Sequence, residues 1–489
     1  MKKRWIALLL LLAIMLPACS EAPVSESGET ENTAVNSSTE TNVAEEKEET
    51  RYKDNVPAGL TYDGATFDIA TREVGHMNYL MNVEEITGEP INDAIYNRNR
   101  AVEARFDIIL TEITDTDTDA PRVAVSAGDD TYEMIKTRGP MAIVFLQQNL
   151  LYIVTDIPYI DLTQPYWDQN LNEALTIGEK QFIVSGALSV TEYDYTSALL
   201  FNKQMISDFG LDMPYDIVHE GKWTQDVMNE MMVKVVSDVN GDGAMTDSDR
   251  YGYLASPKHV LPSFLLAAGQ LSVTKNELDI PGLSMETEPY FNTFTKIFEI
   301  TRDNGAWFVN SSGDNVSVQS IQMFSENKAL FMDTVMFYLE QLREMDSDFG
   351  VIPYPKYDEA QSDYYSRTSW VEPFVVPTTN LKLEMIGAVI EALCCESANT
   401  VIPAYYEASL KGKISRDEDS REMLDLIFAT RIIDFGDTVW VDVVRDGVLS
   451  SMYSDNNRNL SSRIKTMSKQ IKGKMKKLED AIPNWDQGS

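Results

Sequence analysis

The sequence predicts an α/β protein with at least two lobes, each built on a mostly parallel sheet. Three observations support this fold class. The chain has 489 residues, more than the roughly 100–200 residues of one domain. Hydrophobic residues make up 43% of the chain, enough for sizeable cores. From about residue 60, short strand-like segments alternate with longer helix-like ones, a pattern typical of parallel strands joined by helices.

The first folded segments show this alternation most clearly. Residues 66–71 alternate as a half-buried strand does, and residues 91–104 have the apolar spacing of a helix. Residues 106–110 predict a second strand. After a Gly-Asp-Asp turn, residues 132–136 predict a third strand and residues 141–151 predict the helix that follows it.

Helices predominate beyond residue 200, and strands are predicted there at residues 199–203 and 251–253. The helices that the apolar spacing predicts are residues 223–236, 260–268, 288–304, 334–345, 381–396, 416–435 and 461–481. No tandem repeat accompanies them, so the second half of the chain is expected to complete the lobes rather than to form a repeat array.

The N-terminus has the features of a secretory signal. Three basic residues precede an apolar run over residues 5–15, and Leu16-Pro17-Ala18 leads directly to Cys19. This arrangement resembles a bacterial lipoprotein signal, in which residues 1–18 are removed and Cys19 carries a diacylglycerol and acyl (palmitate-type) lipid. An ordinary signal with an incidental cysteine is one alternative. A transmembrane anchor is another, although the run is shorter than the roughly 20 apolar residues of a span.

Residues 19–57 predict a disordered acidic tether. Nine Glu lie between Glu21 and Glu49, and hardly any apolar residue lies among them. Such a segment cannot bury enough surface to offset its ordering entropy, and its like charges repel each other.

The net charge and the cysteines exclude several functions. A formal net charge of −36 argues against nucleic acid and anionic lipid as partners, because both need a positive patch. Cys394 and Cys395 are adjacent in an apolar helix, where a disulfide between neighbours is geometrically unfavourable. The three histidines have no spacing suited to a metal. We therefore expect no disulfide framework and no histidine metal site.

Residues 238–249 match an EF-hand-type calcium loop. Asp238, Asn240 and Asp242 occupy positions 1, 3 and 5, where side-chain oxygens converge on calcium. Gly243 at position 6 permits the sharp turn. The remaining ligands would be the carbonyl of Ala244 and the side chain of Asp249. The expected cofactor is a structural Ca²⁺, and the alternative is an Asp/Asn/Gly turn without an ion.

Several stretches in a fixed order carry a resemblance to a known family. They are Phe201-Asn202-Lys203, Pro214-Tyr215-Asp216, Trp223-Thr224, the calcium-like loop, Arg250-Tyr251-Gly252, Pro353-Tyr354-Pro355 and Ala404-Tyr405-Tyr406. Together they resemble the family 1 extracellular solute-binding lipoproteins of carbohydrate ABC transporters from Gram-positive bacteria. No single stretch is diagnostic, but the ordered set covers nearly the whole chain from about residue 60.

The resemblance implies a two-lobed periplasmic-binding-protein-like fold of the maltose-binding-protein type, with a ligand cleft between the lobes. It places residues 58–194 and 327–374 in lobe 1 and residues 195–326 and 375–489 in lobe 2. The chain would cross between the lobes near residues 193–196, 325–331 and 373–377. A stacking aromatic of the family falls at Met332 or Met336 here, which is a departure that puts sugar stacking at that position in doubt.

Candidate ligand-binding residues follow from the rule that ligands lie beyond the carboxyl ends of strands, and from the hinge. They are Arg72 and Glu73 after the first strand, Arg138 after the third, Tyr193 and Asp194 at the first crossing, and Trp370 and Glu372 at the last. Trp167 and Trp223 are expected to be structural, with Thr224 as a helix N-cap.

The function this predicts is capture of a sugar or oligosaccharide outside the cell membrane and its delivery to ABC transporter permease subunits. We expect a lipid-anchored monomer that is not an enzyme. The nucleophile elbow, zinc-protease and P-loop motifs are missing from the sequence. A calcium-stabilised glycan-binding adhesin and a carbohydrate-active enzyme remain alternatives. The ligand is left open between a sugar, a polyol, a peptide and an anion, because Arg72, Lys136 and Arg138 would suit a negative charge.

Overall fold

A computed structural model describes residues 51–72, 81–115, 119–309, 318–342, 348–410 and 418–481. The chain divides into two compact units, Met1–Thr50 and Arg51–Ser489, and every described residue belongs to the second unit. The predicted signal peptide, the lipid site at Cys19 and most of the predicted tether therefore lie outside the described residues.

The first sheet has the strand order β12-β3-β1-β2. β1 (Ala65–Arg72) pairs in parallel with β2 (Ile108–Asp115) and β3 (Met134–Lys136), and β12 (Phe374–Val375) is antiparallel to β3. The strands predicted at residues 66–71 and 132–136 are confirmed. The strand predicted from residue 106 begins at Ile108 instead, because Phe106 still belongs to the preceding helix.

α1 (Pro90–Phe106) confirms the first predicted helix, and its ends have identifiable causes. Pro90 lies in the first turn, and the Glu89 side chain accepts a hydrogen bond from the Asn92 N–H at 2.7 Å. The helix ends at Asp107, which has a left-handed backbone with φ of 49°. Four shorter helices and one 3-10 turn follow before the second sheet: α2 (Ala120–Ser126), α3 (Gly139–Gln147), η1 (Val154–Asp156), α4 (Gln169–Leu175) and α5 (Thr191–Asp194).

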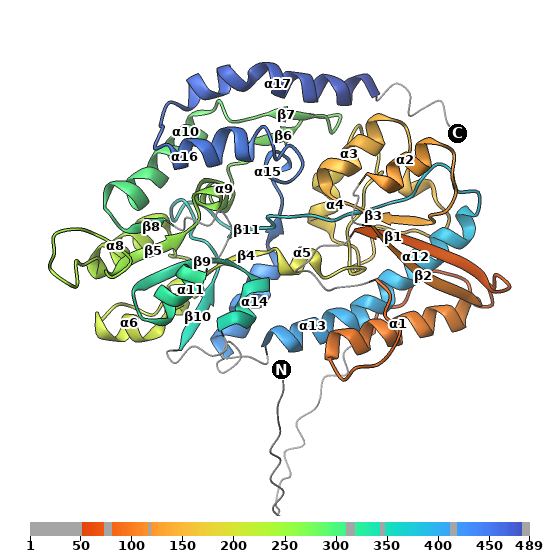
Figure 1. Cartoon of the computed structure of the whole chain (residues 1–489), viewed down its shortest axis with the longest axis horizontal. Helices are drawn as coiled ribbons and strands as arrows, with labels where there is room; N and C mark the ends of the chain where they lie inside the picture. The colour runs from red at the N-terminus through yellow and green to blue at the C-terminus, as the bar shows by residue number, and fades with distance from the viewer. Residues whose placement is uncertain are drawn as a thin grey trace, which may run out of the picture. The chain divides into compact units, whose positions relative to one another are not determined.

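The second sheet has the strand order β10-β4-β9-β5-β8 and is mixed rather than mostly parallel. β5 (Tyr251–Ala255) is parallel to β8 (Trp307–Val309) and β9 (Ala329–Val335). β4 (Ser197–Asn202) is antiparallel to β9 and to β10 (Phe349–Ile352). Figure 1 shows α5 between the two sheets, in the part of the chain where the crossing at residues 193–196 was predicted.

The helices around the second sheet include three that the sequence predicted, at residues 223–236, 260–268 and 288–304, and several short ones that it did not. They are α6 (Lys203–Asp208), α7 (Pro214–His219), α8 (Gln225–Val235), α9 (Pro257–Ala267), α10 (Glu288–Phe298) with a π-helical end (Glu299–Asp303), α11 (Val318–Ser325) and the 3-10 helix η3 (Met336–Leu342). Thr224 caps α8 as predicted, by accepting from the Val227 N–H. The helix predicted at residues 334–345 is wrong at its start, because residues 334–335 complete the fully buried β9. Spacing alone does not separate a buried strand from a buried helix.

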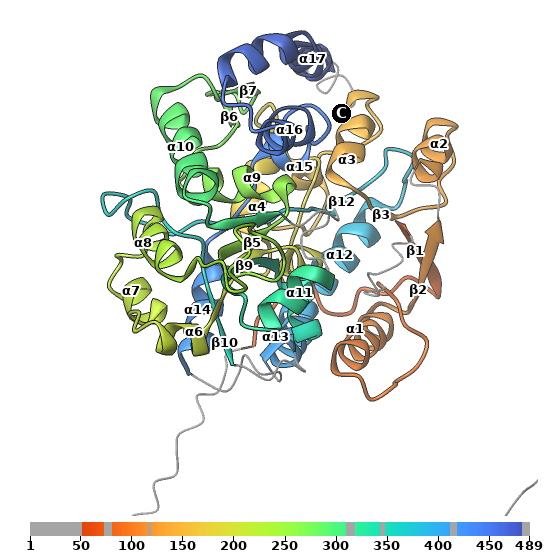
Figure 2. The same ribbon diagram turned by 60° about the vertical axis from the view of Figure 1, so that its left-hand side comes forward.

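The C-terminal part of the chain consists mainly of helices. They are α12 (Leu383–Asn399), α13 (Val401–Leu410), α14 (Glu418–Ala429), α15 (Phe435–Thr438), the π-helical η5 (Arg445–Ser450), α16 (Ser451–Ser454) and α17 (Leu460–Ala481). Two small sheets pair β6 (Val273–Lys275) with β7 (Pro281–Leu283), and β11 (Ser366–Arg367) with β13 (Arg431–Ile432). α17 packs against α3 and η5, at the top of the view in Figure 2.

Two segments lie with the opposite sheet from the one predicted. β9 and β10, expected in lobe 1, pair with β4 of the second sheet. α12 and α13, expected in lobe 2, pack against α1 beside the first sheet. The chain therefore stays in the second sheet near residue 327 and crosses back at β12, within the predicted crossing at residues 373–377. The hydrophobic pattern identified these elements but carried no information about their partners.

The predicted tether is too long at its C-terminal end. Residues 51–57 are described and lie against α1 and α12. Arg105 forms an ion pair with Asp54 and donates to the Val56 carbonyl, and the Val56 side chain is buried. The Tyr52 backbone exchanges hydrogen bonds with the Asn399 side chain.

One helical region, Leu383–Ala408, is long and apolar enough to cross a membrane by length and composition. Its most apolar window is 72% buried inside the fold, as expected of a core helix. Cys394 and Cys395 are both buried free thiols on this region, as the sequence predicted.

Candidate functional site

The parallel strands of both sheets end next to one cluster of side chains. Arg72 ends β1 and Lys136 ends β3, while Phe337 is the second residue after β9. The Tyr195 ring bridges the two halves, since it stacks on Phe337 with a centroid distance of 6.5 Å and lies 6.2 Å from the Trp370 ring. In α/β folds this edge of the sheet is where ligands bind.

Trp370 and Glu372 come from the extended segment that leads into β12, and both contact Arg72. The Arg72 guanidinium donates two hydrogen bonds to Glu372 Oε1, at 2.8 Å from Nε and 2.5 Å from Nη2. Trp370 Nε1 donates to the same oxygen at 3.2 Å. The guanidinium carbons of Arg72 and Arg138 lie 5.4 Å and 4.5 Å from the centre of the Trp370 ring. Four predicted site residues therefore meet at one place.

Buried charges hold this cluster together from beneath. Lys136 is buried, and its Nζ donates to Thr191 Oγ1 at 2.9 Å and lies 3.7 Å from Glu372 Oε2. Burial alone would raise the pKa of Glu372, but the charges of Lys136 and Arg72 bring that pKa below its usual value. Glu192 accepts a hydrogen bond from the Glu372 backbone N–H at 3.0 Å, and burial raises its pKa to about 7. Glu372 is thus the ionised partner of the cations, and Glu192 titrates near neutrality.

The structure separates Tyr193 and Asp194 from this cluster. The Tyr193 ring lies beneath the Arg431 guanidinium, 3.7 Å from its centre, and packs on Phe428. Asp194 is buried and accepts a hydrogen bond from the Tyr405 hydroxyl at 2.8 Å. Both side chains support the crossing segment rather than the cluster at Trp370. Glu73, the remaining predicted residue, lies outside the described residues.

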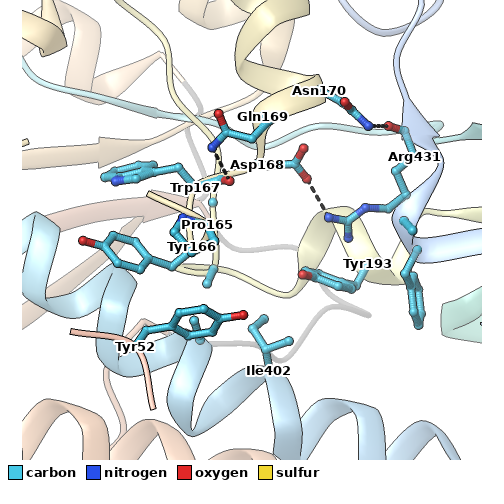
Figure 3. Close-up of a pocket in the computed structure, with 15 residues that line it drawn as sticks. Tyr52, Pro165, Tyr166, Trp167, Asp168, Gln169, Asn170, Tyr193, Ile402 and Arg431 are labelled. Carbon is cyan, nitrogen blue, oxygen red and sulfur yellow. Dashed lines mark hydrogen bonds and ion pairs between the residues drawn. The ribbon is translucent and has the colours of Figure 1, made fainter. Parts of the chain in front are cut away.

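A pocket of about 380 Å³ lies on the Tyr193 side of α5. Figure 3 shows Asp168 and Tyr193 on either side of the Arg431 guanidinium, with Tyr52, Tyr166 and Trp167 across the space. Arg431 Nη2 donates to Asp168 Oδ2 at 2.6 Å. This pocket is not at the carboxyl ends of the parallel strands, so we assign the candidate ligand site to the cluster at Trp370.

Two aromatic residues of the site were missed or misplaced from sequence. Met332 and Met336, where a stacking aromatic was sought, are buried in the core beneath the second sheet. The aromatic ring at this place belongs to Phe337, one residue further along, and is half-buried. Tyr195 was placed at the crossing without being selected. The Tyr-Asp-Tyr sequence at residues 193–195 was the available signal, but it does not show which tyrosine faces which side.

The two tryptophans predicted to be structural are buried. Trp223 packs on Phe331 and donates its indole N–H to the Pro353 carbonyl at 3.0 Å. Trp167 donates to Glu391 at 3.0 Å, although one edge of it also lines the pocket.

The loop at residues 238–249 folds as a tight turn in which backbone amides satisfy the carboxylates. Asp238 accepts from the Gly241 and Gly243 N–H groups, at 2.6 Å and 2.8 Å, and Gly243 has the predicted positive φ, 84°. Asp249 accepts from the Val239 and Thr246 N–H groups. Within the described ranges no group of three His, Cys, Asp or Glu side chains is placed to hold a metal ion. The turn explains these contacts without an ion, so calcium binding stays a prediction.

Comparison with known proteins identifies the fold. No protein-family profile and no curated protein sequence matches the chain. Solved structures do match over most of their length. They include a sugar transporter protein of Rhizobium etli in an open conformation, with 14% identity, a TM-score of 0.58 and coverage of 84% of this chain and 99% of that one. They also include an ABC substrate-binding protein of Listeria monocytogenes in complex with cycloalternan, with 12% identity, a TM-score of 0.52 and coverage of 87% and 99%.

A third match is an ABC transporter solute-binding protein of Thermotoga lettingae bound with α-D-tagatose, at 12% identity and a TM-score of 0.52 over 85% of this chain and 100% of that one. The chain thus has the two-lobed fold of the maltose-binding-protein-like solute-binding proteins, as its sequence predicted. At these identities the likeness concerns the fold.

Proposed function

We propose that this protein binds a sugar or oligosaccharide reversibly outside the cell membrane and delivers it to the permease of an ABC transporter. The observation that carries the proposal is the cluster at Trp370, which lies where the parallel strands of both sheets end. Two of the solved structures that share the fold are described as substrate- or solute-binding proteins, one in complex with cycloalternan and one bound with α-D-tagatose, which supports a binding role.

The chemistry of the cluster suits a sugar. Tyr195, Phe337 and Trp370 provide aromatic surfaces from three different segments, and the C–H faces of sugar rings pack on such surfaces. Arg138 and Glu372 provide charged donors and acceptors beside them for hydroxyl groups. Because a polar site left unpaired by a wrong ligand loses free energy, this mixture of groups gives selectivity.

A thermal-shift screen of the full-length chain, purified in detergent, against mono- and oligosaccharides tests the binding role. A ligand that binds only the folded state raises the free energy of unfolding by mass action, by about 2.7 kcal/mol at a concentration 100 times its Kd, and the unfolding temperature rises with it. We expect at least one sugar to shift the transition and to be recovered unchanged. Turnover of the sugar would instead support the enzyme alternative, and no shift with any sugar would contradict the proposal.

The anchor is a separate part of the proposal. Lipid on Cys19 would hold the protein at the outer face of the membrane, where a tether raises the local concentration at the permease. Replacing Cys19 by Ala in producing cells should move the protein from the membrane fraction to the medium. Retention of the variant in the membrane fraction would contradict lipid anchoring, without bearing on ligand binding.

A further inference from the structure

The candidate site is locally cationic although the whole chain carries a formal charge of −36. Among the described residues of the cluster, Arg72 and Lys136 form ion pairs with the carboxylate Glu372 and stabilise its ionised form, and Arg138 lies with Arg72 against the Trp370 ring. Glu192, the next carboxyl group, is buried and titrates near neutrality. Counted over the residues that the structure describes, the positive charge of the cluster therefore exceeds its negative charge, which is opposite to the balance of the chain as a whole.

Arg138 is the cation of this cluster that has a buried nitrogen without a hydrogen-bond partner among the described residues. Arg72 directs two N–H groups to Glu372, and Lys136 donates to Thr191. Arg138 Nε is buried and has no hydrogen-bond partner among the described residues. A buried donor without a partner destabilises the site, so an acceptor supplied by a ligand would recover free energy at this position.

The electrostatic surroundings of Arg138 also favour binding of an anion at this position. Burial and then the nearby positive charge of Arg72 lower the pKa of Arg138, and Arg445 adds to this effect, while Glu372 opposes it. A bound anion would offset the repulsion between Arg138 and the neighbouring cations. The Arg138 guanidinium also lies over the Trp370 ring, so a sugar that packs against Trp370 would also contact this guanidinium.

We propose that the ligand is an acidic sugar, a mono- or oligosaccharide bearing a hexuronate carboxylate that pairs with Arg138 beside Trp370. This inference rests on the proposed sugar-binding function. The planar carboxylate matches the fork of donors on a guanidinium, and the uronate ring retains the C–H face that packs on Tyr195 and Trp370. A sugar phosphate shares the negative charge but not the planar geometry, and the experiment distinguishes the two.

Titration calorimetry of the full-length chain with matched ligands tests the inference. The ligands are oligogalacturonides, the same oligosaccharides with their carboxylates methyl-esterified, and galactose 1-phosphate. We expect the free acid to bind at least about tenfold more tightly than the ester, and its affinity to fall as salt rises. Arg138→Gln should remove this preference, so that in the variant the free acid and the ester bind with affinities within about twofold of each other. The matched control is Arg122→Gln, because Arg122 lies on α2 and is paired with Asp119, away from the site. This variant should retain the preference for the free acid over the ester.

Each other outcome is decisive. Equal or tighter binding of the methyl ester overturns the acidic-sugar inference but leaves the proposed function standing. Binding of the sugar phosphate alone overturns the carboxylate assignment. An unchanged preference in Arg138→Gln overturns the role of Arg138. If neither these ligands nor the sugars of the thermal-shift screen bind, the proposed function fails and the inference fails with it.

Discussion

Arg72 and Glu372, 300 residues apart in the chain, are joined by two hydrogen bonds from one guanidinium to one carboxylate oxygen. Arg72 ends the first strand of the first sheet, and Glu372 lies where the chain returns to that sheet from the second. The Arg72 and Glu372 side chains are 15% and 5% exposed. The pair therefore fixes the returning segment, and with it Trp370, against the end of β1.

Breaking this pair should destabilise the protein. Glu372→Gln removes the charge that compensates Arg72 and Lys136, and loss of one partner of a buried pair costs about 3–5 kcal/mol. Urea unfolding of the wild type, both single variants and the Arg72→Gln/Glu372→Gln double variant measures the coupling. We expect the double variant to be less destabilised than the sum of the single ones, by more than about 1 kcal/mol. Additive effects would show that the two side chains do not stabilise each other.

Asp333 should make stability depend on pH. This carboxyl group is buried, accepts a hydrogen bond from the Tyr354 hydroxyl through Oδ1, and has no partner at Oδ2 among the described residues. Burial raises its pKa to about 7 from 3.8, with Tyr354 and Arg367 opposing the rise. Because the folded state binds this proton more tightly than the unfolded state, its contribution to stability is complete below about pH 4 and is lost as pH rises through 7.

Asp333→Asn removes this titration while keeping an oxygen for Tyr354. The free energy of unfolding, measured in urea at pH 5, 6, 7 and 8, should fall with pH less steeply in the variant than in the wild type. The slope is the readout, because Glu192 remains in both proteins and titrates in the same range. Parallel slopes would mean that Asp333 does not retain its proton.

Breaking the pair of Arg431 and Asp168 should lower the free energy of unfolding strongly. Arg431 Nε and Nη1 are buried without a partner among the described residues, so Asp168 supplies the carboxylate that compensates this charge. Asp168→Asn should therefore lower the free energy of unfolding by about 3–5 kcal/mol. The matched control is Asp303→Asn, which alters a largely exposed pair with Arg458 and should cost less than about 1 kcal/mol. Equal small effects in both variants would contradict a buried charge at Arg431.

Calcium should stabilise the protein if the loop at residues 238–249 binds it. Extracellular calcium modules have Kd values of roughly 10⁻⁴–10⁻³ M, so 5 mM Ca²⁺ should add about 1–2 kcal/mol relative to EDTA. Asp242→Asn separates calcium binding from the fold of the loop, because the amide oxygen still accepts from the Ala244 N–H but the side chain lacks the charge. It should reduce the calcium effect and leave the unfolding temperature in EDTA unchanged. Identical unfolding temperatures with calcium and with EDTA would contradict the prediction that this loop binds calcium.

The sequence was informative where local physics decides the structure. β1, α1 and the Thr224 cap follow from alternation, helical spacing and a side chain suited to an N-terminus. The strand-end rule selected Arg72 and Arg138, which meet Trp370 in the structure. These features depend on residues within a few positions of one another, or on one strand end.

Features that depend on partners distant in the chain could not be predicted from local sequence patterns. β9 pairs with β4 across at least 130 residues, and nothing in its apolar run specifies β4 as the partner rather than a strand of the first sheet. Tyr193 and Tyr195 are two positions apart, yet one packs beneath Arg431 and the other packs between Phe337 and Trp370. A short helix turns adjacent side chains to different faces, and only the tertiary packing shows which face has the ligand site.

The most direct test of the account is ligand binding by Trp370→Ala, measured by titration calorimetry with the sugar that gives the largest thermal shift. Trp370 is half-buried at the edge of the cluster, whereas Trp223 is fully buried in the core, so only the first is expected to contact a ligand. We predict that Trp370→Ala folds, with the far-ultraviolet circular dichroism of the wild type, and binds the sugar at least about tenfold more weakly, whereas Tyr193→Phe binds it with unchanged affinity. Unchanged sugar affinity in a folded Trp370→Ala variant would contradict the assignment of the ligand site.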